Sequence, residues 1–299
     1  MPSFDFAPAL AAAAAAAGAQ DYPAGSLYVV ATPIGNLADV TLRALHVLGL
    51  VDAVACEDTR HTAALLRAYG VPDKPLLALH QHNEMTAAQA VIARLQAGQR
   101  VAFASDAGTP AVSDPGARLV AACHGAGLRV VPLPGASSVT TALSVAGIVR
   151  EAAFVFVGFL PPKARARQDA VQALAAEPRA VVVLEAPHRI LRLAQALAEL
   201  GARPVTVARE LTKQFEQIHT LRCDALAAGL EQGQSQRGEF VLVLHPCEPP
   251  PHEAGDLRLL RLLLAELPLN RAVRLAAQVS GVARNDLYAA ALSLRQDPK

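Results

Sequence analysis

Charged and polar side chains in this chain gather directly after short apolar runs. The segment "CEDTRHT" (56–62) places Asp58, Arg60 and His61 within one helical turn, immediately after the apolar run 53–56. A carboxylate, a guanidinium and an imidazole so close together suit hydrogen bonding to a polar substrate, or proton transfer. A helix cap followed by solvated charges is the alternative explanation of the same residues. Asp58 and His61 are therefore candidates for acid–base chemistry.

A second polar segment, "SDAGTPAVSDPG" (105–116), follows the apolar run 101–104 and combines two Asp, two Pro and two Gly. Ligands of open α/β sheets bind beyond the carboxyl ends of the strands, where this segment would lie. Gly108 permits a close backbone approach, and Pro110 stiffens the loop. Asp106 can accept hydrogen bonds from hydroxyls or balance a positively charged ligand. Turns and helix caps alone would explain the same composition.

Two further corners contain proline and glycine. "VATPIGNLADVT" (30–41) includes Pro33 and Gly35, and "PLPGASS" (132–138) includes the capping candidate Ser137. The first corner matches neither G-x-G-x-x-G nor the P-loop motif, so a phosphate cradle is poorly supported. Because all three corners follow strands of one predicted sheet, we expect them to line one pocket.

Positive charge is concentrated in the middle of the chain. Residues 150–222 hold eleven Lys/Arg and seven Asp/Glu, residues 1–149 hold eight and ten, and the whole chain has a net charge of +1. This balance excludes a dispersed binder of polyanions and favours local patches. The densest patch, "LPPKARARQDA" (160–170), offers Lys163, Arg165 and Arg167 as phosphate contacts. "LEAPHR" (184–189) and "ARELTKQFE" (208–216) add Glu185, Arg189 and Lys213 at strand ends. Partly buried ion pairs are the alternative explanation for Arg209–Glu210 and Arg237–Glu239.

The hydrophobic pattern predicts an α/β protein, because apolar runs alternate with amphipathic stretches. In the first half, strands are expected at 27–31, 53–56, 76–79, 101–104 and 129–132, with helices at 37–48, 60–68, 85–96, 117–125 and 137–146. In the second half, strands are expected at 154–157, 180–184, 204–208, 216–220 and 240–244, with helices at 164–176, 189–200 and 225–229. The closer strand spacing in the second half predicts hairpins and a mixed sheet.

These elements divide the chain into two α/β domains, 26–148 and 150–246, a proline-rich linker at 247–256, and a helical module at 257–299. Residues 1–25 are expected to form a low-complexity tail, because no basic residue precedes Arg43 and the alanine run lacks the charged start of a signal peptide. No apolar run is long enough to span a bilayer. We expect no metal site: the four cysteines are far apart, and "HQHNE" (80–84) lacks a third ligand.

Taken together, the ordered motifs resemble one known family. "TPIGNLADVT", "EDTRHT", "HNE", "SDAGTPAVSDPG", "PLPGASS", "GFLP", "EAPHR", "ARELTK" and "RGEFVLV" are similar to those of the ribosomal RNA small-subunit methyltransferase I family, within the tetrapyrrole-methylase superfamily. The similarity runs from about residue 27 to residue 244, and "AELPLNRA" and "NDLYAAAL" near the C-terminus are similar too. Each motif alone is weak, whereas the ordered set is specific.

The resemblance implies two tetrapyrrole-methylase-type α/β domains with S-adenosylmethionine in the cleft between them. It implies a cytoplasmic homodimer that methylates the ribose 2′-hydroxyl of a cytidine in 16S rRNA, on bare RNA or in the small ribosomal subunit. By the same resemblance, the cofactor contacts are Pro33, Gly35, Asp106, Ala107, Gly108, Pro110, Ser137, Phe156 and Leu184.

The chemistry of this reaction needs alignment of sulfur, methyl and oxygen, together with a base or a cation for the attacking hydroxyl. The catalytic candidates are Asp58, His61, Glu185 and Lys213, and the expected RNA contacts are Arg60, His82, Lys163, Arg165, Arg167 and Arg189. Two alternatives stay open: the same cofactor with a small tetrapyrrole or a protein as substrate, and a non-enzymatic RNA-binding protein with a vestigial cleft.

Overall fold

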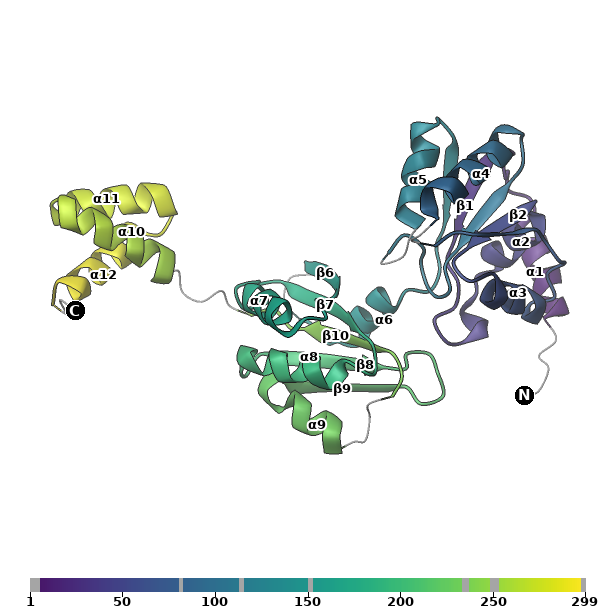
Figure 1. The fold of residues 1–299 in the computed structure, drawn as a ribbon. Coiled ribbons are helices and arrows are strands. Elements are labelled where there is room, and N and C mark those ends of the chain that lie inside the picture. Colours follow the sequence, from purple (N-terminus) through teal and green to yellow (C-terminus); the bar gives the residue numbers. More distant parts are fainter. Residues whose placement is uncertain are drawn as a thin grey trace.

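The computed structural model describes residues 6–80, 83–112, 116–149, 153–232, 237–247 and 253–296. It contains two five-stranded sheets that are flanked by helices, followed by three helices at the C-terminal end (Figure 1). The predicted α/β class is confirmed.

The first sheet is entirely parallel and has the order β3-β2-β4-β1-β5. Its strands are β1 (Ser26–Val30), β2 (Ala53–Cys56), β3 (Leu76–Ala78), β4 (Val101–Ala104) and β5 (Arg129–Leu133). One face packs against α2 (Leu42–Leu50) and α3 (Thr59–Ala68), and the other against α4 (Glu84–Gln96) and α5 (Gly116–Gly125). Burial on both faces explains why these strands are continuous apolar runs.

The second sheet is mixed, as the strand spacing predicted, and has the order β6-β7-β10-β8-β9. β6 (Phe154–Phe159) and β7 (Ala180–Glu185) are parallel, whereas β8 (Pro204–Arg209), β9 (Gln217–Arg222) and β10 (Phe240–Leu244) pair antiparallel. One face is covered by α7 (Ala164–Ala175), α8 (Ile190–Leu197) and α9 (Leu226–Gln232), with short 3₁₀ turns at Ala198–Leu200 and Cys223–Ala225. The other face packs against α6 (Ser138–Val145) and against Ile34 from the first half, so the two halves share an apolar cluster.

Within the range 1–25, where we expected a low-complexity tail, the described residues include a packed helix. Residues Ala7–Ala17 form α1, which packs against α2, and Ala13 and Tyr22 are buried in the same core cluster. The Tyr22 hydroxyl donates a hydrogen bond to the carbonyl of Ala17 at 3.1 Å. Small alanine side chains let α1 approach α2 closely, so an alanine run that looks like low complexity is part of the first core.

One predicted helix is divided in two. The expected helix 37–48 is a 3₁₀ turn at Leu37–Asp39 followed by α2, because Val40 and Thr41 are extended. Asn36 caps the turn and Thr41 caps α2, each by accepting a backbone N–H with its side-chain oxygen. Two capping residues five positions apart thus begin two short helical segments instead of one.

The C-terminal helices α10 (Glu253–Glu266), α11 (Leu269–Ser280) and α12 (Arg284–Gln296) pack on one another around Leu260, Val273, Ala276, Leu287 and Ala291. The predicted domain boundaries at 148–150 and 247–256 stay a prediction. In the part of the chain that the structure describes, no helix is both long and apolar enough to cross a membrane. Within the same residues, no three His, Cys, Asp or Glu side chains are arranged to hold a metal ion.

Candidate active site

The site begins where β1 and β4 end, because these strands are neighbours in the first sheet. Thr32 and Gly108 exchange two backbone hydrogen bonds of 3.0 Å, and the Thr32 hydroxyl donates to the carbonyl of Ser105 at 3.1 Å. Gly108 has φ of 80°, and a Cβ there would lie 3.3 Å from Cγ2 of Ile34. A glycine is therefore required for the two loops to close on each other, which brings Pro33 beside Asp106.

The second half contributes Lys213 through a tightly closed pair of loops. After β8, Glu210 and Thr212 take left-handed φ values of 51° and 65°. Before β10, Glu239 donates its backbone N–H to Oε1 of Glu210 at 2.9 Å and accepts that of Glu210 at 3.0 Å. Lys213 Nζ lies 2.8 Å from Oε1 of Glu210 and 3.1 Å from Oε2 of Glu239. A Cβ on Gly35 would lie 2.4 Å from Cγ of Lys213, so only glycine lets the lysine cross here.

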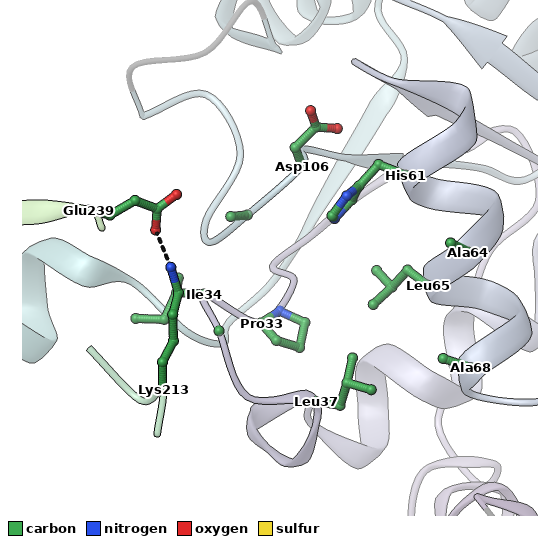
Figure 2. Close-up of a pocket in the computed structure, with 12 residues that line it drawn as sticks. Pro33, Ile34, Leu37, His61, Ala64, Leu65, Ala68, Asp106, Lys213 and Glu239 are labelled. Carbon is green, nitrogen blue, oxygen red and sulfur yellow. Dashed lines mark hydrogen bonds and ion pairs between the residues drawn. The ribbon is translucent and has the colours of Figure 1, made fainter. Parts of the chain in front are cut away.

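These loops enclose two cavities. The first, of about 400 Å³, is lined by Pro33, Ile34, Gly35, Leu37, His61, Ala64, Leu65, Ala68, Asp106, Ala107, Lys213 and Glu239 (Figure 2). The second, of about 420 Å³, is lined by Ile34, Glu57, Ser105, Asp106, Ala107, Val112, Ser138, Phe159, Leu184, Glu185, Ala186, Pro187, Glu239, Phe240 and Val241. Ile34, Asp106, Ala107 and Glu239 line both, and they form what we call the shared wall.

The two cavities differ in charge. Among the described residues, the ionisable side chains that line the second cavity are Glu57, Asp106, Glu185 and Glu239, all of them acidic. The first cavity adds a lysine and a histidine, Lys213 and His61, to Asp106 and Glu239. A positively charged ligand is therefore favoured in the second cavity, whereas the first cavity offers an anionic ligand a cationic partner, Lys213.

Lys213 keeps its charge. Burial lowers the pKa of its amine, but the hydrogen bonds to Glu210 and Glu239 outweigh burial, so the pKa of Lys213 is raised above its ordinary value. The group is therefore an ammonium at neutral pH. It can stabilise a negatively charged oxygen, and it cannot act as a neutral amine base there.

Glu185 is buried at the wall of the second cavity, with an exposed fraction of 2%. Its Oε1 lies 3.0 Å from Nε of Arg189 and accepts the backbone N–H of Ala186 at 2.9 Å. Oε2 has no hydrogen-bond partner among the described residues. A buried carboxylate oxygen without a donor is costly, so this atom suits a ligand that donates a hydrogen bond.

Asp58 begins helix α3. Its Oδ1 accepts the backbone N–H of Arg60 at 2.8 Å, and its Oδ2 lies 2.8 Å from Nη2 of Arg60. These hydrogen bonds hold the pKa of Asp58 at about 2, so its carboxylate is a weak base at neutral pH. Asp58 lines neither cavity, but its backbone N–H donates to Oδ1 of Asp106 at 3.2 Å. In the structure Asp58 thus caps α3 and fixes it against Asp106, and its catalytic role stays a prediction.

Exchange of the Asp58 side chain separates these two roles. We expect Asp58→Asn to keep catalytic activity within threefold of wild type, because asparagine caps helices as well as aspartate does. Asp58→Ala should lower the thermal midpoint by about 2–4 °C, through the lost cap. Calorimetric unfolding and a single-turnover assay measure both effects. A loss of activity in the asparagine variant with an unchanged midpoint would restore Asp58 as the base.

The structure brings most of the predicted site residues together. Pro33, Gly35, His61, Asp106, Ala107, Leu184, Glu185 and Lys213 line the two cavities. Gly108 and Pro110 are buried in the same loop as Asp106, and Ser137 immediately precedes α6, next to Ser138 of the second cavity. His82 lies outside the described residues.

Three predicted contacts have protein partners in the structure, and their predicted roles stay predictions. Phe156 packs in the apolar cluster between α6 and the second sheet and lines neither cavity. Arg167 is buried on the inner face of α7, where Nη1 donates to the carbonyl of Pro162 at 3.1 Å. Arg189 is half-buried, paired with Glu185 and bonded to the carbonyl of Leu160. These two guanidinium groups bind the protein itself, whereas Lys163, Arg165 and Arg60 are exposed.

The predicted site residues did not include part of both linings: Ile34, Leu37, Glu57, Ala64, Leu65, Ala68, Ser105, Val112, Ser138, Phe159, Ala186, Pro187, Glu239, Phe240 and Val241. Only in α3 did the sequence pattern indicate which of these residues face a cavity. His61, Ala64, Leu65 and Ala68 recur at helical spacing on a face other than the buried one of Thr62 and Leu66. The other residues of the two linings show no such spacing in the sequence.

Comparison with known proteins defines the class. Residues 26–227 match the model of the Tetrapyrrole (Corrin/Porphyrin) Methylases. Uroporphyrin-III-C-methyltransferase from Thermus thermophilus has the same fold, with a TM-score of 0.53 and 22% identity over 74% of this chain and 94% of that one. The cobalt precorrin-4 methyltransferase CbiF aligns with a TM-score of 0.57 and 17% identity over 75% and 98%. Fold and family model thus define a tetrapyrrole-methylase-type protein.

Closer relatives narrow the class. Ribosomal RNA small subunit methyltransferase I of Escherichia coli O157:H7 is 49% identical over 91% of this chain and 96% of its own length. The protein of that name from Pseudomonas aeruginosa is 47% identical over 90% and 97%. Residues 250–295 match the RsmI C-terminal HTH domain. The chain belongs to the ribosomal RNA small subunit methyltransferase I family.

Proposed function

We propose that this protein transfers the methyl group of S-adenosylmethionine to the ribose 2′-hydroxyl of a cytidine in 16S rRNA. The observation that carries the proposal is the family relationship: relatives that are 44–49% identical over about nine tenths of the chain bear the name ribosomal RNA small subunit methyltransferase I. The chemistry of the two cavities supports it independently.

The second cavity fits S-adenosylmethionine. At neutral pH this cofactor carries a sulfonium, an ammonium and a carboxylate, so its net charge is positive. Four carboxylates line the cavity, the buried Oε2 of Glu185 has no partner among the described residues, and Leu184, Phe240 and Val241 offer apolar surface to a purine. When bound, the cofactor supplies a methyl group activated by its positively charged sulfur.

The residues of the chain then perform positioning and electrostatic work. The closed loops around Gly108 and Gly35 hold the shared wall rigid, which fixes the distance between donor and acceptor. Lys213 stabilises the negative charge that develops on the attacking oxygen. His61, on the same cavity as Lys213, is positioned to accept the proton of that hydroxyl. Glu185, which lines the second cavity, accepts a hydrogen bond from the cofactor.

The partner of the reaction is RNA of the small ribosomal subunit, and the proposed assembly is a cytoplasmic homodimer. Lys163 and Arg165 supply exposed positive charge at the start of α7, next to the β6 end of the second sheet. Many other cations of the basic middle segment are bound within the protein. Arg203, for example, donates to the carbonyls of Leu174, Glu177, Arg179 and His245.

Charge reversal at Lys163 and Arg165 tests whether this basic patch contacts RNA. We expect the double variant Lys163→Glu/Arg165→Glu to raise KM for small ribosomal subunits about fivefold to tenfold. The slope of log KM against log salt should become smaller by about 2, because two phosphate contacts are lost. Arg129→Glu, an exposed reversal at the start of β5, is the matched control and should change neither quantity. An unchanged KM and salt slope in the double variant would remove the patch from the RNA interface.

The function itself is tested by methyl transfer from labelled S-adenosylmethionine to small ribosomal subunits from cells that lack this gene. Nuclease digestion and mass spectrometry should place one label per particle on the ribose of a cytidine. Label on a base nitrogen or carbon would contradict the 2′-oxygen assignment. No label on rRNA in any form would contradict the proposal as a whole.

A further inference from the structure

We infer that the first cavity, between α3 and Lys213, binds the target nucleoside after the nucleotide has been turned out of the RNA. This inference rests on the proposed function, because it assumes that the acceptor is a ribose hydroxyl of RNA. It adds a division of labour between two neighbouring cavities: the cofactor in the second and the nucleoside in the first.

The wall of the first cavity is suited to a flat heterocycle. Helix α3 buries Thr62 and Leu66 against the sheet, yet it presents His61, Ala64, Leu65 and Ala68 to the cavity. The exposed face of an amphipathic helix is normally polar, so the exposed Ala64 and Ala68 suit an apolar partner, whereas Leu65 is half-buried against the first core. Leu37, which is 38% exposed, and Pro33 extend the same surface opposite Lys213 (Figure 2). Enzymes that act on nucleotides commonly hold an extruded base against apolar side chains.

Charge separates the two possible occupants. S-adenosylmethionine carries net positive charge, which favours the second cavity, where the ionisable side chains among the described lining residues are acidic. A nucleotide carries negative phosphate, and the ammonium of Lys213 lines only the first cavity. The reverse arrangement would place the sulfonium beside this ammonium, and the phosphate in the cavity whose described lining residues include no cationic side chain. Charge therefore favours the cofactor in the second cavity and the nucleotide in the first.

The geometry allows the two ligands to meet. Methyl transfer requires the acceptor oxygen to approach the methyl carbon to about 3–3.5 Å, so donor and acceptor sites must adjoin. Ile34, Asp106, Ala107 and Glu239 line both cavities, so a ribose in the first cavity lies directly beside the cofactor site. Neither cavity, at about 400 and 420 Å³, admits a base-paired helix. The nucleotide must therefore leave the RNA stack to react.

Filling the first cavity from α3 tests this assignment. We expect Ala64→Trp to slow methyl transfer to small subunits at least 100-fold, while calorimetry gives a Kd for S-adenosylmethionine within threefold of wild type. Arg67→Trp is the matched control: it adds the same indole to an exposed position of α3 that lines neither cavity. It should leave both quantities within threefold. Ala68→Trp, one turn further along the same wall, provides a second block with the same expected outcome.

The two measurements separate the possible failures. Near-normal transfer by both Ala64→Trp and Ala68→Trp would overturn the nucleoside site. Loss of S-adenosylmethionine binding in these variants, with a thermal midpoint equal to that of Arg67→Trp, would place the cofactor in the first cavity and also overturn it. A wild-type protein that binds the cofactor but does not methylate rRNA would contradict the proposed function instead.

Discussion

Replacing Lys213 with methionine should slow methyl transfer by about 10²–10³-fold and leave the Kd for S-adenosylmethionine within threefold of wild type. Removal of one preorganised group that stabilises a developing negative charge typically has an effect of about this size. Methionine keeps the length and apolar stem of lysine, so the change removes charge and hydrogen bonding more than shape. A stopped-flow or single-turnover assay measures the chemical step, and calorimetry measures cofactor binding.

The expected size of this effect follows from how firmly the ammonium is held. Two carboxylates, at 2.8 and 3.1 Å, fix Nζ of Lys213 at the edge of the first cavity. Because the pKa of Lys213 is raised, the ammonium persists from pH 7 to pH 9, and the wild-type rate should not fall across this range through loss of that charge. A Lys213 that acted as a neutral base would instead give a rate that still rises above pH 10.

Lys74→Met is the control for the loss of a positive charge elsewhere. Lys74 binds the carbonyls of Gly49 and Val51 on the first domain and lines neither cavity. Its variant should transfer methyl groups at close to the wild-type rate once the protein is folded. Equal losses of cofactor affinity and rate in Lys213→Met would assign the lysine to the cofactor and would contradict its role at the attacking oxygen.

The second large effect is expected at Asp106, on the shared wall. Asp106→Asn should weaken S-adenosylmethionine binding by about 10- to 100-fold, because it removes a negative charge beside a positively charged ligand. The Oδ1 atom of asparagine can still accept the backbone N–H of Asp58, so the local structure is retained. S-adenosylhomocysteine lacks the sulfonium charge, and its affinity should fall less than threefold.

Comparing the affinities for S-adenosylmethionine and S-adenosylhomocysteine shows whether Asp106 interacts with the charge on the sulfonium. Asp73→Asn, a change at an exposed position that lines neither cavity, controls for net charge and should alter neither affinity. Equal weakening of both ligands by Asp106→Asn would show that the carboxylate binds a ribose hydroxyl or the amino group instead. Unchanged affinity for both would remove Asp106 from the cofactor site.

The strands were predictable because buried strands appear in the sequence as short runs of apolar residues. The ranges 53–56, 101–104 and 240–244 match β2, β4 and β10 at both ends, since each is a short apolar run bounded by polar residues. Helix limits were less accurate. The prediction of one helix at 37–48 was wrong because Val40 is extended and Thr41 begins α2 as its cap. The spacing of the hydrophobic residues alone does not reveal this break. Helix α1 was missed because alanine gives a weak amphipathic signal, so only packing against α2 reveals it.

The site was predictable at the level of loops but not of every side chain. The corners at 32–35 and 105–110 do meet, because β1 and β4 are neighbours in a parallel sheet. The basic cluster at 163–167 was over-interpreted: Arg167 recurs with Val171 and Leu174 on the buried face of α7, a spacing that marks it as inward-facing. Arg189 could not be separated from a surface cation by sequence, since its partner Glu185 is buried only by the tertiary fold.

Some residues that line the second cavity could not be identified from the sequence. Phe240 and Val241 belong to a strand whose pattern indicates only a buried core, yet both line the cavity because β10 begins beside the loop of Glu239. Whether an apolar strand end faces a core or a ligand depends on which elements cover it. That information is present in the packing of the two halves and absent from local pattern.

The central claim is that the donor and the acceptor occupy two cavities that meet at Ile34, Asp106, Ala107 and Glu239. A crystal structure of the protein with S-adenosylhomocysteine tests it most directly. We expect the adenosine in the second cavity, among Leu184, Glu185 and Phe240, with the sulfur at the shared wall and facing Lys213. S-adenosylhomocysteine seated against the α3 face of Ala64 and Ala68, or bound outside both cavities, would contradict this claim.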